Sequence, residues 1–282
     1  MKKQILIASF ISLSFIANAQ EQVLLSKKGE RILPEKGDWA VAVDASPFLN
    51  FVGNVFSSSG KNSLFKSYAD SNLTVMGKYF TKDNRAIRVK LNIGVTSKNE
   101  KFDTQKSGQT DPNVTVIDSW KNTKTSITLG AGIENRKGKN RLQGLYGVEA
   151  MFFYLEGQKE KYAYGNNFSK NDNNPAGHDF NGNILADGSR VTARKQGATY
   201  GIGARGFVGM EYFIFPKLSL GLEYGLLLNI GKQGDGQEVS EIWDKTNEEK
   251  KTQTKKISGN TVVNFNSGVR NGNALIYASF HF

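Results

Sequence analysis

Apolar and polar residues alternate along most of the chain after Trp39. Alternation at a period of two places successive side chains on opposite faces of an extended strand. The clearest run has Ile87 and Val89 on one side and Arg88 and Lys90 on the other. Eight segments share the pattern, and we expect each to be a strand: 39–46, 73–80, 87–95, 126–134, 142–154, 200–212, 218–230 and 273–282.

The connections between these segments alternate in length. Three are short (81–85, 135–140 and 215–217), and four are long and polar (roughly 52–69, 97–119, 159–196 and 231–260). An even number of strands with short turns at one end and long loops at the other is the plan of outer-membrane barrels. The sequence therefore predicts an all-β protein, an eight-stranded antiparallel transmembrane β-barrel over residues 38–282. We expect short periplasmic turns and long extracellular loops.

The amino-terminal stretch has the features of a secretory signal peptide. Lys2 and Lys3 precede an apolar run, and Ala17-Asn18-Ala19 follows as a small-x-small cleavage site. We expect residues 1–19 to be the signal peptide and residues 20–37 to be a periplasmic segment. No later segment approaches the roughly 20 apolar residues that a spanning helix needs. An exported chain without such a helix is either soluble beyond the inner membrane or crosses the outer membrane as strands. The alternating lengths of the connections favour the second option, in the outer membrane of a Gram-negative bacterium.

One face of the expected strands carries ionisable residues as well as Gly, Ser, Thr and Asn. In a barrel of eight strands this face points into an interior just wide enough for side chains. Buried charges there must be paired, because an unpaired one is costly. We expect four acids and four bases to form a lumen charge network: Asp44, Lys78, Arg88, Lys90, Glu149, Arg205, Glu211 and Glu223.

The last segment reads NALIYASFHF and ends on Phe282. Ala274, Ile276, Ala278, Phe280 and Phe282 share one face, which resembles the carboxy-terminal strand of small outer-membrane barrels of the OmpA/OmpX type. In that class the barrel-assembly machinery reads such a strand. The stretch LPEKGDWAVAVDASPFLNFVGNVF (33–56) is similar to the start of outer-membrane barrel proteins of Bacteroidota. The resemblance implies compartment and architecture, and it leaves the role open.

Charge and composition narrow the classes of partner. The net charge is +11, from 37 Lys and Arg against 26 Asp and Glu. Its distribution argues against nucleic acid, because the short turns hold a basic rim: Lys82, Arg85, Arg136, Lys137, Lys139, Arg141 and Lys217. We expect this rim to attract anionic headgroups of the inner leaflet or, alternatively, an acidic periplasmic partner. The absence of cysteine excludes disulfides and thiolate metal sites.

The sequence contains only incomplete matches to known nucleotide-binding, catalytic and calcium-binding motifs. GIGARG (201–206) matches G-x-G-x-x-G, but it lies within a strand and no helix follows, so we expect no nucleotide site. His178 lies in the longest loop without an identifiable nucleophile, and His281 is expected at the periplasmic rim. DFNGN (179–183) begins like a calcium loop but lacks the required Gly and Glu. Loose calcium binding by the Asn/Asp-rich loop stays open, and we expect no cofactor.

These patterns predict a non-enzymatic outer-membrane protein with a structural or interaction role, either on its own or as a subunit of a larger outer-membrane complex. A small porin-like channel is the alternative, and an outer-leaflet lipid-modifying enzyme is less favoured. Ile242 and Trp243 are the large apolar residues of the fourth long loop. They are candidates for partner contact or for packing on a neighbouring loop, in a loop whose mixed charge suits a hydrated hairpin.

Overall fold

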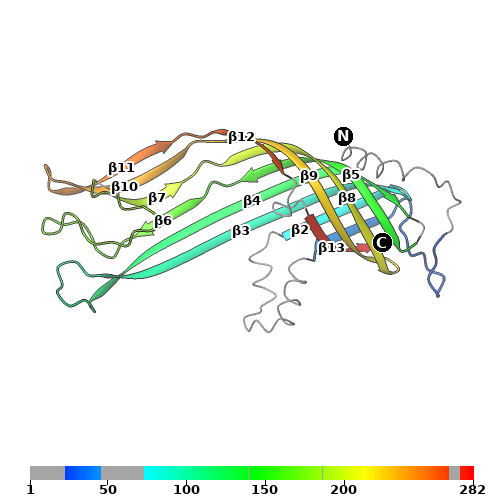
Figure 1. Cartoon of the computed structure of the whole chain (residues 1–282), viewed down its shortest axis with the longest axis horizontal. Helices are drawn as coiled ribbons and strands as arrows, with labels where there is room; N and C mark the ends of the chain where they lie inside the picture. Colours follow the sequence, from blue (N-terminus) through cyan, green and yellow to red (C-terminus); the bar gives the residue numbers. More distant parts are fainter. Residues whose placement is uncertain (1–22, 46–72, 139, 186, 267–273) are drawn as a thin grey trace, which may run out of the picture.

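The computed structural model describes residues 23–45, 73–138, 140–185, 187–266 and 274–282. Within those ranges the protein is all-β, with thirteen strands in one antiparallel sheet and no helix. Figure 1 shows two parts: a closed group of curved strands, and a long arm that leaves it in one direction. The expected signal peptide, residues 1–19, lies outside the described ranges.

Eight strands pair in sequence until the last meets the first. They are β1 (Trp39–Asp44), β2 (Leu73–Lys82), β3 (Arg85–Gln105), β4 (Thr115–Lys137), β5 (Leu142–Leu155), β8 (Thr199–Phe215), β9 (Leu218–Gln233) and β13 (Ala274–His281). Every neighbouring pair is antiparallel, and β1 bonds to both β2 and β13. We call this set the ring. Six ring strands contain one of the segments expected from the alternation, whereas β1 covers 39–44 of the expected 39–46 and β13 covers 274–281 of the expected 273–282.

The two faces of the ring are reversed relative to a water-soluble protein. Along β9, the leucines at 220, 222, 226 and 228 point outward and are exposed, whereas Ser219 and Glu223 point inward and are fully buried. The same alternation holds on β1, where Trp39 is 56% exposed and Ala40 is 1% exposed. The ring therefore presents a continuous apolar outer face, and its polar residues are enclosed.

The short connections and both described ends of the ring lie together. The Trp39 N–H donates to the Phe282 carbonyl at 2.8 Å. The segment before β1 packs at the same end, where the Lys36 N–H donates to Asp83 at 2.8 Å and the Gly37 N–H to the Phe80 carbonyl at 2.8 Å. We call this the short-turn end.

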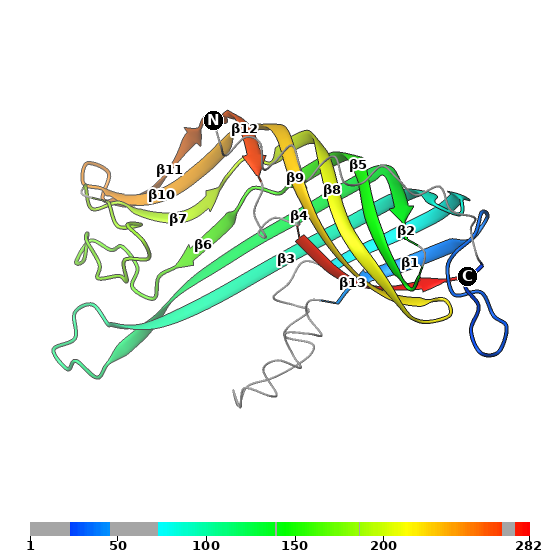
Figure 2. The same ribbon diagram turned by 45° about the vertical axis from the view of Figure 1, so that its right-hand side comes forward.

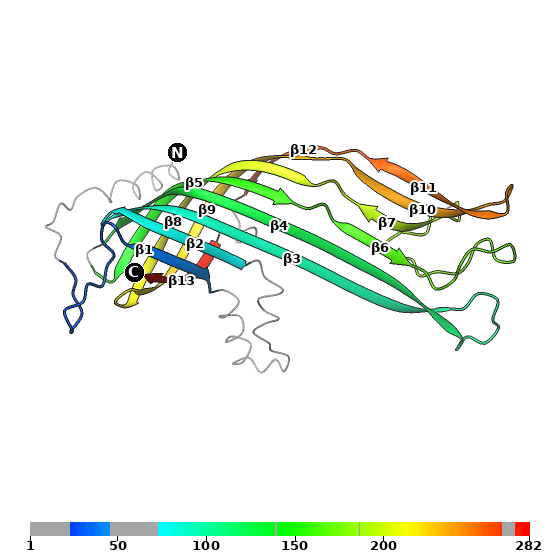
Figure 3. The same cartoon turned by 180° about the vertical axis from the view of Figure 1, so that it is seen from behind.

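The arm lies at the opposite end. β3 and β4 continue as one hairpin up to the Gln105–Thr115 pair, and further strands extend the sheet from β4. These are β6 (Lys159–Ala163), β7 (Arg190–Lys195), β10 (Gly236–Asp244) and β11 (Glu249–Ile257). β12 (Thr261–Asn266) pairs with the upper half of β9. Figures 2 and 3 show the arm running away from the ring as one curved sheet.

The arm corrects the expectation that 97–119, 159–196 and 231–260 are loops. The first and third ranges are mostly strand, and the second begins with β6 and ends with β7. These strands were missed because they carry polar residues on both faces. β11, for example, reads EKKTQTKKI and has no apolar alternation. The expected hairpin in the fourth long loop is present as β10 and β11. No helix in the described ranges is long and apolar enough to cross a membrane.

Candidate functional site: the ionic interior, the arm and the outer face

The lower part of the ring interior, next to the short-turn end, is organised around Glu211. Its carboxylate lies 2.6 Å from Arg136 and 3.4 Å from the Lys78 ammonium, and it accepts a hydrogen bond from the Ser219 hydroxyl. The ring nitrogen of His281 lies 3.2 Å away. Lys78 and Arg136 also meet a second carboxylate, Glu134, at 2.9 and 3.0 Å, so cations and carboxylates alternate around this layer.

The upper layer is organised around Arg88. Its guanidinium lies 2.7 Å from Glu223, 2.8 Å from Glu149 and 3.0 Å from Glu134. Arg205 bridges Glu149 and Glu223 at 2.8 and 2.5 Å. Glu134 therefore belongs to both layers, and the ion pairs form one connected cluster through the interior.

Aromatic rings and glycines complete the packing of this interior. The guanidinium of Arg88 lies 4.2 Å from the centroid of the Phe207 ring. A Cβ at Gly221 would lie 2.1 Å from the Tyr277 ring, and one at Gly225 would lie 2.5 Å from the Arg205 guanidinium. These two glycines on β9 therefore leave the space that the larger side chains occupy.

The structure brings most of the expected lumen charges together, with corrections. Seven of the eight join the cluster: Lys78, Arg88, Lys90, Glu149, Arg205, Glu211 and Glu223. Asp44 is half-buried at the end of β1, opposite Tyr277. Glu134 was expected in a strand but not counted among the lumen charges, and Arg136 was expected in a turn, but β4 continues to Lys137. Their even-numbered positions therefore point inward, where both are buried. The expected balance of four and four becomes five cations and four carboxylates in the connected cluster.

His281 lies at the short-turn end, where it was expected, since its N–H donates to the Lys217 carbonyl. Its side chain, however, points into the ring, is 4% exposed and packs near Phe80 and Phe213. The cause is the alternation of β13, which turns Tyr277 and His281 inward. The same alternation turns the expected assembly signal outward: Ile276, Phe280 and Phe282 are exposed, and Ala278 is half-exposed.

The remaining basic-rim residues lie at the short-turn end. Lys82, Arg85, Lys137 and Lys217 are exposed. Arg85 donates to the Asn135 side chain at 2.9 Å, and Arg141 donates to the carbonyl oxygens of Phe213 and Ile214. Lys139 lies outside the described residues. Arg136 is the one expected rim residue that the structure moves to the interior.

The arm has its own small core. Trp120, Tyr162, Phe180 and Val191 pack together, with Tyr164 against them. Burial raises the pKa of the Tyr162 phenol from 10.0 to about 12. Because this cluster joins β4, β6, β7 and the segment between β6 and β7, it fixes that segment on the sheet.

Polar contacts order the long segment between β6 and β7. Asp118 on β4 is fully buried and accepts hydrogen bonds from the Gly165 N–H at 2.8 Å and the His178 N–H at 2.7 Å. The His178 ring stacks on Phe102 with centroids 3.9 Å apart. Arg190 pairs with Glu241 at 2.7 Å. Sequence reasoning missed Asp118 because its partners are distant in sequence.

Two features of the arm bear on the expected chemistry. The His178 ring contacts aromatic rings, and no group of three or more metal-ligating side chains occurs in the described ranges.

Ile242 and Trp243 lie on β10 opposite Lys251 and Lys250, and both are half-buried. Contact of these two residues with a partner, or packing on a neighbouring loop, stays a prediction.

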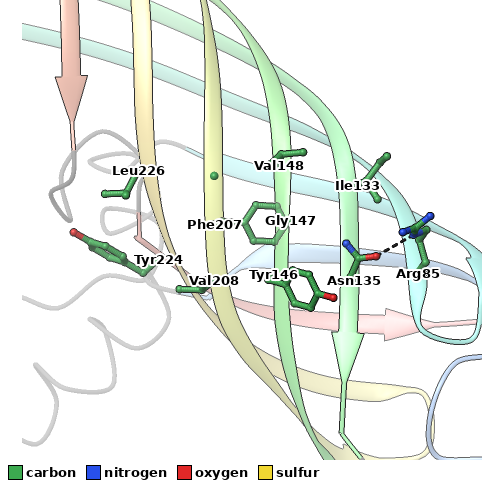
Figure 4. Close-up of a pocket in the computed structure, with 11 residues that line it drawn as sticks. Arg85, Ile133, Asn135, Tyr146, Gly147, Val148, Phe207, Val208, Tyr224 and Leu226 are labelled. Carbon is green, nitrogen blue, oxygen red and sulfur yellow. Dashed lines mark hydrogen bonds between the residues drawn. The ribbon is translucent and has the colours of Figure 1, made fainter. Parts of the chain in front are cut away.

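The outer face of the ring contains a groove of about 700 Å³ (Figure 4). Arg85 and Asn135 lie at one end, and Tyr224 and Leu226 lie at the other. The gap arises at Gly206, which points outward, and a Cβ there would have no atom within 4 Å. The groove thus joins the basic short-turn end to the exposed apolar face.

Comparison with known proteins adds little. No family model matches the chain, and no curated protein matches it. Among solved structures, the chain has a likeness to the crystal structure of the outer membrane protein OprG from Pseudomonas aeruginosa. That match has a TM-score of 0.34 and 11% identity, and it covers 89% of this chain and 98% of that one. A similarity this low carries no argument about fold or function, so the proposals below depend on the geometry alone.

Proposed function

We propose that the chain is an integral protein of a Gram-negative outer membrane, which its ring crosses as an eight-stranded β-barrel. The observation that carries this proposal is the reversed distribution of side chains. Leu222, Val208 and Val148 are 46%, 61% and 63% exposed on the outer face, while Arg88 and Glu223 are fully buried within. In water, each such apolar side chain would forgo roughly 1.5–3 kcal/mol of burial. Acyl chains remove that cost.

The closed pairing supports the same proposal. Within a bilayer every backbone N–H and C=O must be satisfied internally, and closed barrels meet this requirement because they have no strand edge. Every ring strand pairs with a neighbouring strand on each side, and β1 closes the ring by pairing with β13. Apart from its small apolar core, the arm carries polar side chains on both faces, which suits the aqueous space beyond the outer leaflet.

A structural or interaction role is favoured over transport or catalysis. Two layers of ion pairs cross the interior, and Lys78, Arg88, Glu134, Glu211 and Glu223 are at most 1% exposed. An eight-stranded ring leaves room for side chains, whereas water-filled channels need about 16 strands. The arm supplies a large ordered surface for a partner, and the protein is proposed to be non-enzymatic and without a cofactor.

Membrane insertion is tested by fractionation and refolding. We expect the full-length chain to remain in outer membranes after extraction with alkaline carbonate, and the purified chain to refold in detergent micelles with a heat-dependent shift in electrophoretic mobility. A chain that stays monodisperse without detergent, or that fractionates with soluble proteins, would contradict the proposal.

The role is tested separately. Planar-bilayer recordings are expected to show no defined single-channel conductance, and regular steps would favour the porin-like alternative. Lipid A mass spectrometry of cells with wild-type protein and with His178→Ala is expected to show the same species, and a difference would favour an enzyme. Co-purification from native membranes identifies any protein partner, whether it binds the arm or the short-turn end.

A further inference from the structure

The outer face of the sheet changes character where the ring meets the arm. Up to Tyr154 and Tyr200, whose rings lie 5.2 Å apart, outward positions are largely apolar. The next outward positions along β4 are Thr125, Thr123 and Lys121. Aromatic rings followed by cations are typical of the level at which a membrane protein passes from acyl chains to headgroups.

Four lysines occupy neighbouring outward positions at this level, and we call them the lysine patch: Lys121, Lys159, Lys161 and Lys195. Lys121 on β4 lies directly opposite Lys161 on β6, and Lys159 on β6 lies directly opposite Lys195 on β7. β4, β6 and β7 are neighbours in the arm (Figure 3). Directly opposed residues have Cβ atoms about 5 Å apart, so two pairs of like charges face one another.

The inner face of the same strands is organised differently. Glu160 lies opposite Arg194, their charged atoms are 3.6 Å apart, and Arg194 also pairs with Glu238 at 2.7 Å. Charges of opposite sign are therefore matched on one face, and charges of the same sign are opposed on the other. Like charges in direct opposition destabilise a sheet, so the outer arrangement calls for an external anion.

Carboxylates of the chain neutralise only part of the patch. Glu156 pairs with Lys159. Within the described ranges no carboxylate oxygen lies within 4 Å of the ammonium groups of Lys121, Lys161 or Lys195, and all three side chains are exposed. Their charge is available to a ligand that approaches from the membrane side.

We propose that the lysine patch binds the phosphate groups of an anionic glycolipid of the lipid A type in the outer leaflet. The inference rests on the proposed membrane insertion, which sets the patch at headgroup level. Successive outward positions on one strand are about 7 Å apart. The patch therefore presents two pairs of ammonium groups, and a phosphate can bridge each pair. Its position immediately beyond the apolar face favours a lipid headgroup over a soluble anion.

The test uses the refolded full-length chain in detergent micelles, with two ligands: lipid A carrying both phosphates, and the same lipid A after removal of both. The variant is Lys121→Gln/Lys161→Gln. Its matched control is Lys27→Gln/Lys28→Gln, which removes the same charge from exposed positions in the segment before β1. Dissociation constants are measured at low and at physiological salt, and far-UV circular dichroism checks folding.

A lysine near an anionic surface contributes about a fivefold gain in affinity. We therefore expect the patch variant to bind phosphorylated lipid A about 25-fold more weakly than wild type at low salt, with a smaller difference at higher salt. The control variant should bind like wild type, and dephosphorylated lipid A should bind weakly and equally to all three proteins. Equal affinity of patch variant and wild type, or equal binding of both lipids, overturns the inference.

The two proposals fail in different ways. If the chain refolds in micelles and the patch variant binds unchanged, only the lysine patch is refuted. If the chain does not enter micelles at all, the proposed membrane insertion fails and the inference fails with it. A variant that loses its circular dichroism spectrum is replaced by Lys121→Arg/Lys161→Arg, which is expected to keep wild-type affinity because it preserves both charges.

Discussion

Replacing Arg88 by methionine tests whether the ionic cluster holds the ring together. Arg88 contacts three carboxylates at 3.0 Å or less. Methionine keeps an unbranched apolar side chain at this position but removes the charge and the guanidinium that lies on the Phe207 ring. Removing one partner of a buried ion pair typically costs about 3–5 kcal/mol, because the other partner stays buried without compensation.

The structure places the expected effect at the lower end of that range. After the change, Glu134 still has Lys78 and Arg136, and Glu149 still has Lys90 and Arg205. Glu223 keeps Arg205 alone. No carboxylate is left without a cation, so we expect a loss of about 3 kcal/mol in the free energy of unfolding.

A matched control lies on the same strand. Arg85 on β3 is exposed and donates one hydrogen bond to Asn135, and Arg85→Met should cost less than about 1 kcal/mol. Both variants and wild type are refolded into phospholipid vesicles and unfolded with urea, with tryptophan fluorescence as the probe. Linear extrapolation gives the free energies. Losses that agree within about 0.5 kcal/mol for the two variants would refute the reasoning.

A double variant separates lost attraction from uncompensated charge. In Arg88→Met/Glu223→Gln, the carboxylate that depends most on Arg88 is neutral. We expect the double variant to be at least about 1 kcal/mol more stable than the sum of the single effects, because neighbours in one network couple. Additive effects would show that the Arg88–Glu223 contact contributes nothing of its own.

Three further predictions concern the outer face and the arm. Gly206→Leu should fold with wild-type yield, because the groove has space for the leucine side chain. Gly147→Leu should not fold, since a Cβ there would lie 2.0 Å from a carbonyl oxygen of β4. The heat-dependent shift in electrophoretic mobility measures the folded fraction of both variants. Asp118→Ala should make protease cleave the segment after β6 at least tenfold faster while the ring stays intact, because the N–H groups of Gly165 and His178 lose their buried acceptor. Asp103→Ala, at an exposed arm position, should leave the cleavage rate unchanged. Burial raises the pKa of Tyr162 to about 12, so the folded arm disfavours the phenolate form. The arm should therefore keep its stability below pH 10 and lose stability as the pH rises from 10 to 12. Protease sensitivity should increase across that window, and a flat profile would contradict this prediction.

The ring strands were predictable because each separates two environments. Where apolar and polar residues alternate, as in the run from Ile87 to Leu91, the period identifies both the strand and its faces. The arm lacks this signal. Apart from Phe102, Lys98 to Gln105 is polar on both faces, so hydrophobic periodicity ends there, although pairing with β4 continues.

The sequence predicted that the interior contains paired charges, but it did not identify every residue of the ionic cluster. Arg136 was assigned to the short connection 135–140, and the register with β5 shows that the strand continues past it. The fold of the segment after β6 depends on Asp118, more than forty residues upstream of Gly165 and His178. Contacts of that kind leave no local pattern in a single sequence.

The ionic interior also accounts for a specificity that an apolar interior would lack. A strand with apolar residues on both faces has weakly specified register, because a slip of one residue exchanges equivalent faces. In the ring, a slip of β3 by one position would turn Arg88 and Lys90 to the apolar outer face and leave Glu149 and Glu223 buried without them. We therefore infer that the charges define the register of the closed sheet more than they add to its stability, in keeping with the modest net value of buried ion pairs. The Arg88→Met/Glu223→Gln variant distinguishes these two roles. A loss of stability with one unchanged electrophoretic band would show that the charges contribute to stability alone. Several folded bands would show that the charges define the register.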